Sequence, residues 1–455
     1  MSEALLSAPD KSLTGHRQAV AVFAVLSAMA LVVLDAGIAN LALPVLGETF
    51  GVAPAQAILV VTAYQAGLVM ALLPAGALGE RYGYRRVFAI GLGVFATASA
   101  LSALAPSLPW LVAARLVQGL GGAAIMALGV ALLRASVGSG RLGAAIGWNA
   151  LTVALASAAA PSLGAIVLAV GGRPALFAAG LPLAAAALAA TRALPTGPRK
   201  TARPDLAGMA LNALAFGLLI TSATVAPRAP DHAVLLFALG AGALATLVRR
   251  DMGRSDPLIP LDLLRGAAFR LSVVASVCCF AGQTAGLVAL PFLLQHGLNQ
   301  SPLMAGLYIT AWPLSVAVSA VVAGRLADRV PSAGLCAVGG GCLSAGLAGA
   351  ACWPLDGQPA RLIPFIVLAG VGFGLFQTPN NRTHFLAAPP GRGGAAGGMQ
   401  GSARVTGQTI GALAMSLLFA LTAAQTAPAI GLGLAAGLAL VAGLVSLLRG
   451  ARASR

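Results

Sequence analysis

The feature that most constrains this chain is a succession of apolar runs, each about 20 residues long and separated by short polar, glycine- or proline-containing segments. A helical run of that length crosses the ~30 Å hydrocarbon core of a bilayer. The 455 residues are 58% hydrophobic and 9% charged, whereas soluble domains carry roughly 25% charged residues. Soluble cores stop growing near ~250–300 residues, so no soluble fold hides this much apolar surface. The sequence therefore predicts an all-α integral membrane protein.

About fourteen apolar runs can be separated along the chain, which predicts about fourteen transmembrane helices. They cover residues 20–44, 55–76, 87–105, 108–133, 142–170, 174–190, 206–225, 233–248, 271–294, 302–324, 333–353, 362–378, 397–421 and 427–448. An even number of crossings places both termini on one side. No small-residue cleavage site follows a short apolar stretch near the N-terminus, so the first run is predicted to be a retained helix.

The basic residues predict the orientation. Of the 28 Lys and Arg residues, Arg173, Arg228 and Arg361 fall in loops opposite the N-terminus. Arg115 and Arg404 fall within helices, and the other 23 lie on the N-terminal side. Because cytoplasmic loops carry the excess of Lys and Arg, we expect both termini in the cytoplasm and the chain in a bacterial inner membrane. The net charge of +16 then reflects topology, and no nucleic-acid partner is expected because no basic run is interleaved with aromatics.

Two short loops on the N-terminal side resemble each other. One covers residues 76–86 and the other begins at Gly324, and each has an acidic residue, Glu80 or Asp328, four residues after a glycine. Such a recurrence indicates two similar halves, as in many secondary transporters. We therefore expect an N-terminal six-helix half over residues 1–192, an inserted helix pair with flanking cytoplasmic segments over 193–268, and a C-terminal six-helix half over 269–455.

Five segments in order resemble signatures of the major facilitator superfamily, in particular its fourteen-helix drug:proton antiporter family, which includes quaternary-ammonium and multidrug exporters. The loop 76–86 has Glu80 where Asp is usual, segments 34–44 and 114–119 resemble the helix 1 and helix 4 signatures, and the segment from Asp256 to 261 resembles the linker after the inserted pair. Segment 160–165 keeps Pro161 and Gly164 of the helix 5 signature, with Ala at two usual Gly positions. At Pro161 and Gly164 the resemblance implies a kink.

The resemblance implies two six-helix halves of major facilitator type with two extra helices between them. It also implies a secondary active transporter, a proton-coupled antiporter that exports hydrophobic or cationic drugs or toxic compounds by alternating access. The alternative within the same fold is a carrier for uptake or export of a non-drug metabolite, and neutral or anionic substrates attracted by Arg115 or Arg404 stay open. The expected partners are a small-molecule substrate, protons and the lipid bilayer, and a monomer suffices because the cavity lies between halves of one chain.

Asp35 is the one acidic residue that falls well inside a predicted helix. An ionisable side chain in the bilayer interior is costly and by default marks a functional site. Asp35 lies nine residues before Pro44, about 14 Å from the outer end, and Arg115 lies seven residues after Leu108, about 10 Å from the same side. We therefore expect Asp35 to be the proton-coupling carboxylate and Arg115, at a similar level, to be its partner. The alternative is a structural salt bridge or an interfacial position for Asp35.

Polar residues within other predicted helices are candidates for a substrate cavity. Gln400, Arg404 and Gln408 are spaced four residues apart and form one polar stripe. The stripe either contacts substrate or a carboxylate, or holds helices together, and each other candidate could likewise form an interhelical hydrogen bond. The complete set of residues expected to line the cavity is Asn40, Tyr64, Gln65, Gln118, Trp148, Asn149, Gln283, Gln377, Gln400, Arg404 and Gln408.

Charged residues and glycines at the cytoplasmic helix ends form a predicted gate. Its members are Gly76, Glu80, Arg81, Gly83, Arg85, Arg86, Asp328 and Arg329. They can lock the two halves together in an outward-open state and release them on inward opening. The same residues also act as a topology signal, and both roles can hold together.

Other function classes find little support in the sequence. A membrane sensor or enzyme would need catalytic groups, but the chain has no nucleophile–base pair and no clustering of its four histidines. The pattern of a phosphate-binding loop does not occur, which argues against an ATP-driven pump. We therefore expect no enzyme activity, no catalytic residues, no cofactor and no metal site.

Overall fold

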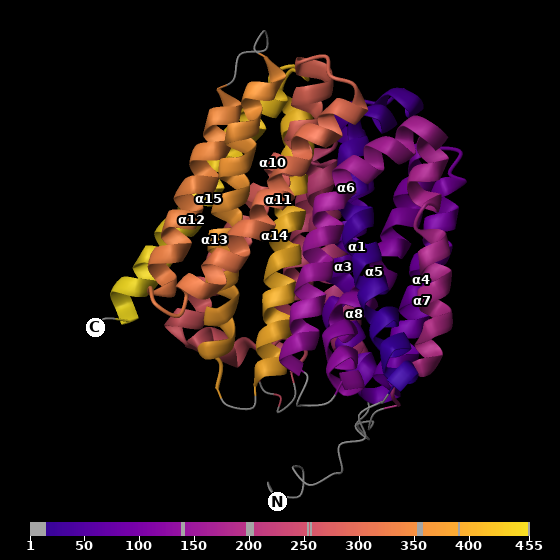
Figure 1. Ribbon diagram of the computed structural model, residues 1–455, viewed down its shortest axis with the longest axis vertical. Coiled ribbons are helices and arrows are strands. Elements are labelled where there is room, and N and C mark those ends of the chain that lie inside the picture. The colour runs from indigo at the N-terminus through magenta and orange to yellow at the C-terminus, as the bar shows by residue number, and fades with distance from the viewer. Residues whose placement is uncertain are drawn as a thin grey trace, which may run out of the picture.

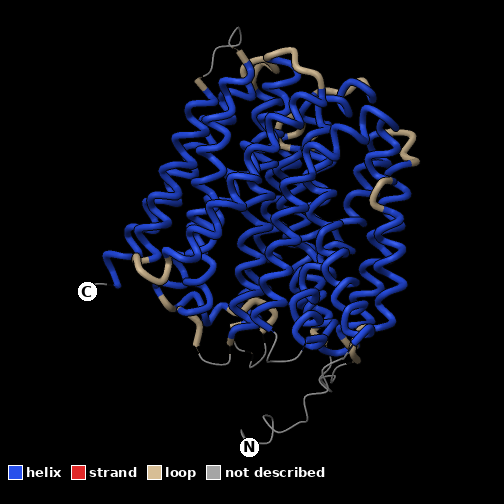
Figure 2. Tube along the Cα trace, in the orientation of Figure 1, coloured by secondary structure: helices blue, strands red, loops and turns tan. Residues whose placement is uncertain are grey.

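The computed structural model describes residues 15–137, 142–196, 204–252, 254, 257–352, 358–389 and 392–453, and in these ranges the regular structure is helical (Figure 2). Asp256 lies outside the described residues. The helices are α1 (Gly15–Phe50), α2 (Pro54–Ala57), α3 (Leu59–Tyr82), α4 (Tyr84–Ala103), α5 (Leu108–Val137), α6 (Leu142–Ala178), α7 (Leu181–Ala190), α8 (Leu206–Val225), α9 (Pro230–Asp251), α10 (Ala267–Phe292), α11 (Pro302–Leu326), α12 (Ser332–Ala351), α13 (Ile363–Leu386), α14 (Gly393–Leu421) and α15 (Ala427–Ala453).

The described ranges contain 13 helical segments long and apolar enough to cross a membrane, and one of them has 47 residues, more than twice the ~20 that one crossing needs. Gly172, within this segment, has a non-helical backbone with φ 62°. Ser99, near the end of α4, donates a hydrogen bond to the Phe177 carbonyl over 2.7 Å. The Ala193 carbonyl, further along the chain, accepts one from Arg17 at the start of α1 over 3.4 Å. The chain therefore turns at Gly172 and returns across the bundle, which makes fourteen crossings.

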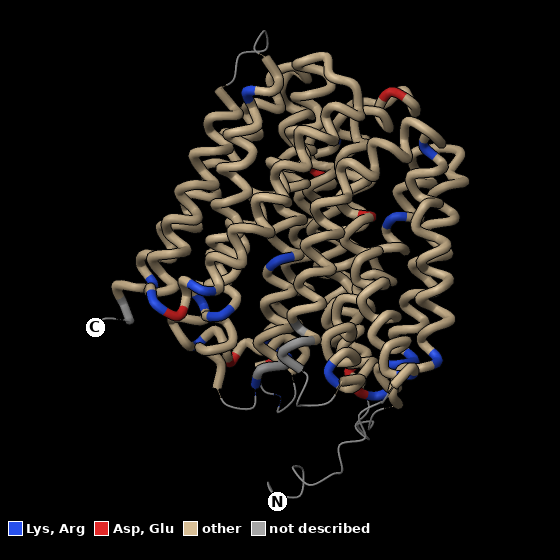
Figure 3. The backbone as a smooth tube through the Cα atoms, viewed as in Figure 1, with Lys and Arg blue, Asp and Glu red and all other residues tan. Residues whose placement is uncertain are grey.

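The first helix begins and the last helix ends toward the lower side of the bundle in Figure 1. We call the side where α1 begins the N-terminal face and the other side the opposite face. Figure 3 shows that Lys and Arg gather at the N-terminal face, with few on the opposite face or in the middle. This is the asymmetry that the loop sequences predicted.

The helices form two groups that lie side by side (Figure 1). In one, α3 packs against α5, α4 against α5, and α1 against α6; in the other, α10 packs against α15, α15 against α12, α12 against α13, and α13 against α11. Small residues at these crossings let the backbones approach closely, which is how helices associate in a bilayer. The two groups meet where α6 packs on α11 and where α14 packs on α3.

The pair α8 and α9 packs on the first group through α3. Asn212 on α8 donates a hydrogen bond to the Met70 carbonyl over 2.8 Å. Asp205 caps the start of α8 and forms ion pairs with Arg250, at 2.8 Å, and with Arg254. These contacts hold both ends of the pair at the N-terminal face.

Candidate functional site

A large cavity of about 3220 Å³ lies between the two helix groups. Its walls come from α1, α3, α5 and α6 on one side and from α10, α11, α13 and α14 on the other. The lining includes Glu80 near the end of α3, Arg134 near the end of α5 and Arg250 near the end of α9, all at the N-terminal face. The cavity therefore opens at that face.

Contacts between the two groups close the opposite face. Gln295 donates a hydrogen bond to the Leu41 carbonyl over 3.1 Å. His296 Nε2 lies 3.1 Å from Glu48 Oε1, so the residues after α10 are tied to the last third of α1. The cavity is accessible from one face and blocked at the other.

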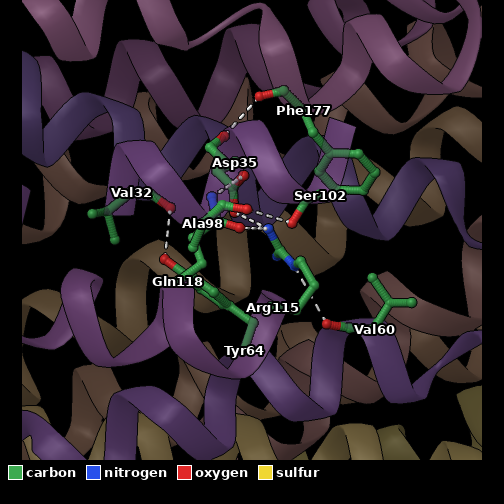
Figure 4. A network of polar contacts seen from close by, with 10 residues as sticks. Val32, Asp35, Val60, Tyr64, Ala98, Ser102, Arg115, Gln118 and Phe177 are labelled. Carbon is green, nitrogen blue, oxygen red and sulfur yellow. Dashed lines mark hydrogen bonds and ion pairs between the residues drawn. The ribbon is translucent and has the colours of Figure 1, made fainter. Parts of the chain in front are cut away.

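Asp35 on α1 is held by two side chains of α5 (Figure 4). Arg115 Nη1 lies 2.5 Å from Asp35 Oδ2, and Gln118 donates its amide to Asp35 Oδ1 over 2.9 Å. The same Arg115 nitrogen donates to Gln118 Oε1 over 2.7 Å, and Arg115 Nε donates to the Val60 carbonyl over 3.4 Å. Positions 115 and 118 meet one carboxylate because residues three apart share a helix face.

Aromatic rings pack against the Arg115 guanidinium, whose side chain is fully buried. Its central carbon lies 4.4 Å from the centre of the Tyr64 ring and 5.7 Å from that of Phe177. Asp35 keeps 12% of its side chain exposed. Burying an ion pair is costly unless hydrogen bonds satisfy the remaining donors and acceptors, and Gln118 and the Val60 carbonyl supply such bonds. The carboxylate is therefore deep in the protein and still reachable.

A close approach of α3 and α5 sets the position of this network. A Cβ placed on Gly119 would lie 2.1 Å from the Tyr64 carbonyl oxygen, and one on Gly67 would lie 2.3 Å from the Leu116 carbonyl oxygen. No side chain fits at such distances, so glycine lets the two backbones touch. Tyr64 is thereby brought beneath Arg115.

Nine of the eleven residues predicted to line the cavity do so. They are Asn40, Tyr64, Gln65, Asn149, Gln283, Gln377, Gln400, Arg404 and Gln408. Gln118 is fully buried in the Asp35 network, away from the cavity wall, because the carboxylate supplies its partner. Trp148 is 60% exposed and does not line the cavity. Successive side chains of a helix point about 100° apart, so Asn149 faces the cavity while Trp148, the residue before it, points away from it. The cavity prediction was wrong for these two residues.

Arg404 projects from the middle of α14 into the cavity wall. Its Nε has no hydrogen-bond partner, and the guanidinium forms no ion pair with any residue that the structure describes. Tyr64, on the neighbouring α3, lines the same cavity. Gln400, one turn before it, donates to Asn381 Oδ1 over 2.8 Å. The polar stripe of α14 therefore faces the cavity rather than lipid.

The predicted gate residues lie apart from one another in two sets. Gly76, Glu80 and Arg81 line the cavity near its mouth. Gly83 forms the tight turn between α3 and α4 with φ 96°, a conformation that favours glycine. Arg85 donates to the Leu194 carbonyl over 3.5 Å, in the segment that follows α7, and Arg86 is exposed.

In the second half, Asp328 pairs with Arg382 of α13 at 2.8 Å, and Arg329 is exposed. The ion pair of Asp328 thus stays within the C-terminal group of helices. A gate formed by these residues would be released when the N-terminal face is open, as it is in this structure.

Pro161 and Gly164 lie where α6 crosses α1 and α11. A Cβ on Gly164 would lie 3.2 Å from Ile38 Cγ1, and one on Gly306 of α11 would lie 2.7 Å from the Pro161 carbonyl oxygen. The backbone is helical at Pro161 and Gly164, and the non-helical dihedral angles of α6 are at Gly172. Both positions permit the close packing that joins the two helix groups.

Sequence reasoning missed a buried polar cluster in the second half. Arg449, 5% exposed, donates to Asn380 Oδ1 over 2.7 Å and lies 3.5 Å from Cys336 Sγ. Asn380 and His384 both contact Ser276 Oγ, at 2.8 and 3.2 Å. The sequence places Arg449 among the basic residues of the N-terminal side because it ends an apolar run, and the i, i+4 spacing of Asn380 and His384 is the available signal for the cluster.

Comparison with known proteins identifies relatives over nearly the whole chain. The uncharacterized transporter YebQ of Escherichia coli (strain K12) is 39% identical over 405 residues, covering 88% of each chain. The tetracenomycin C resistance and export protein of Streptomyces glaucescens is 29% identical, over 88% of this chain and 75% of that one. The riboflavin transporter RibZ of Clostridioides difficile (strain 630) is 27% identical, over 85% of each.

A solved structure supports the fold. The peptide transporter POT in complex with sulfate superimposes with a TM-score of 0.71 at 18% identity, covering 99% of this chain and 98% of that one. The sequence model of the Major Facilitator Superfamily matches residues 25–412. The expected fold is confirmed, and the chain belongs to the Major Facilitator Superfamily, whose members are transporters and not enzymes.

Proposed function

We propose that this protein is a proton-coupled secondary transporter that exports hydrophobic small molecules by alternating access, with Asp35 as the proton-coupling carboxylate. The observation that carries the proposal is the network of Asp35, Arg115 and Gln118 beside a cavity open at one face. An ionisable group this deep in a membrane protein is costly, which argues for a function that needs it. The export protein of Streptomyces glaucescens among the relatives supports the direction.

The proposed orientation places the N-terminal face in the cytoplasm, because that face carries the excess of basic residues. The cavity is then open inward and blocked outward by the contacts of Glu48 and Gln295. In this state the Asp35 carboxylate is paired with Arg115. Substrate enters from the cytoplasm, and the protein works as a monomer because the cavity lies within one chain.

Coupling follows from what a proton does to the pair. Protonation of Asp35 removes the charge that holds Arg115, and a buried pair that loses one charge is strongly destabilised. When the cavity faces outward, protonation from the acidic side would break the network and release substrate; when it faces inward, loss of the proton restores it. The gate residues Glu80 and Asp328 would join the two halves only in the outward-open state.

A carrier for a non-drug metabolite is the second candidate. The unpartnered amide oxygens of Asn40, Gln65 and Asn149 favour it, because they offer specific hydrogen-bond acceptors along the cavity. Riboflavin is the named substrate of one relative. This candidate shares the coupling proposed at Asp35 and differs in substrate range.

The test is transport in inside-out vesicles that carry a proton gradient, acid inside. We would add lipophilic cations, neutral aromatics and organic anions in turn and follow collapse of the gradient with a pH-sensitive dye. Wild type should show substrate-dependent collapse, and Asp35→Asn should show none, whereas Asp231→Asn, which changes an acid at the start of α9, should behave like wild type. Coupling retained in Asp35→Asn would remove Asp35 from the mechanism.

A further inference from the structure

The charge balance deep in the cavity is positive. Asp35 is paired with Arg115 and also accepts a hydrogen bond from Gln118. Arg404, on the facing α14 wall, has no ion pair with a described residue, so its charge remains after the other two cancel. The other charged side chains of the lining, such as Glu80 and Arg134, lie near the mouth at the N-terminal face. They are more exposed to water there, which screens them.

From this we infer that Arg404 binds the anionic group of the substrate, so that the transported molecules are organic anions with an apolar body. The inference rests on the proposed function, because it takes the cavity to be the substrate site. An unpaired guanidinium in a water-poor site attracts a carboxylate, sulfonate or phenolate and repels a cation. Arginine also suits such groups geometrically, since its planar donors match two oxygens at once.

The neighbours of Arg404 complete a site for such a molecule. Gln408 lines the cavity one helical turn further along the same face of α14 and offers an amide donor beside the guanidinium. Phe280, Ile309 and Trp312 line the cavity from α10 and α11 and provide an apolar surface for the body of the substrate. The Trp312 ring nitrogen has no hydrogen-bond partner, so it is a further donor without an acceptor.

Arg404 and the coupling pair border the same cavity. Tyr64 and Arg404 both line the cavity, and the Tyr64 ring centre lies 4.4 Å from the central carbon of the Arg115 guanidinium. An anion bound at Arg404 would therefore share the cavity with Arg115, the group that holds Asp35.

Direct binding of matched probes tests the inference without any gradient. We would embed the purified protein in lipid nanodiscs and measure equilibrium binding of tritiated 2-naphthoate, 2-naphthamide and 2-naphthylmethylammonium, which share one ring system and differ in charge. Wild type should bind naphthoate at least tenfold more tightly than the ammonium probe. Arg404→Gln should abolish that preference and Arg404→Lys should keep part of it, while Arg228→Gln, a matched change of an exposed arginine between α8 and α9, should leave it unchanged.

Three results would overturn the inference: equal or tighter binding of the ammonium probe by wild type, an anion preference that survives in Arg404→Gln, or no saturable naphthoate binding to wild type. Each is distinct from failure of the proposed function. Coupled transport of cations without naphthoate binding would leave proton coupling in place and remove the anion site. Naphthoate binding through Arg404 without proton coupling in the vesicles would leave the anion site in place and remove proton coupling.

Discussion

Arg115 Nη1 lies 2.5 Å from Asp35 Oδ2, so an arginine of α5 and an acid of α1, 80 residues apart in the chain, form one ion pair inside the first helix group. Both charges are withdrawn from bulk water, and each supplies most of the compensation for the other. The pair therefore links the stability of the helix group to the ionisation of one carboxylate.

Breaking the pair from the arginine side should be more harmful than removing both charges. Arg115→Gln leaves the Asp35 carboxylate buried and unpaired, at an expected cost of about 3–5 kcal/mol, while the Asp35→Asn/Arg115→Gln double variant should recover much of that loss. Thermal unfolding of the purified variants in one detergent measures both. Additive losses in the double variant would mean that the two residues are not coupled.

Tyr64 should act through its ring and not through its hydroxyl when it supports Arg115. The ring centre lies 4.4 Å from the guanidinium, whereas the hydroxyl makes a long 3.5 Å contact to the Val32 carbonyl. Tyr64→Phe should cost less than about 1 kcal/mol, and Tyr64→Ala should cost several, since it removes both the cation–π contact and the core volume. Equal melting temperatures for the two variants would contradict this assignment.

Gly119 should tolerate no side chain. A methyl group there would lie 2.1 Å from the Tyr64 carbonyl oxygen, so Gly119→Ala must push α3 and α5 apart. We expect a loss of at least about 2 kcal/mol in stability, together with a weakened Asp35 network. Gly433→Ala on α15 is the matched control, because a Cβ there meets no atom within 4 Å. Fluorescence-detected gel filtration after heating compares the fraction of each variant that stays folded. Equal fractions for Gly119→Ala and Gly433→Ala would refute the close-packing argument.

The Glu48–His296 contact should be present only while the opposite face is closed. The two side chains meet at 3.1 Å across the helix groups. In a Glu48→Cys/His296→Cys variant, a short bis-methanethiosulfonate cross-linker should hold that face shut and stop transport, and dithiothreitol should restore it. The single-cysteine variants control for the five native cysteines. Full transport by the cross-linked double variant would show that this face need not open.

The sequence by itself determined the membrane class, the number of crossings and the asymmetry of basic residues. Each of these depends on local quantities, because a run of about 20 apolar residues must form a helix in lipid and short basic loops stay on one side. The cost of a buried acid likewise singled out Asp35 without knowledge of its neighbours.

Only the tertiary structure decided which side chains meet. In the folded protein Gln118 lies in the Asp35 network and not at the cavity wall, Trp148 points outward, and Arg449 is buried against Asn380. It also left Arg404 facing the cavity without an acidic partner among the described residues. Helix rotation and the pairing of helices distant in the chain set these outcomes. Apart from a few polar residues, helices such as α1 and α5 have apolar side chains around their whole circumference, so their sequences carry little record of which face they present to a neighbour.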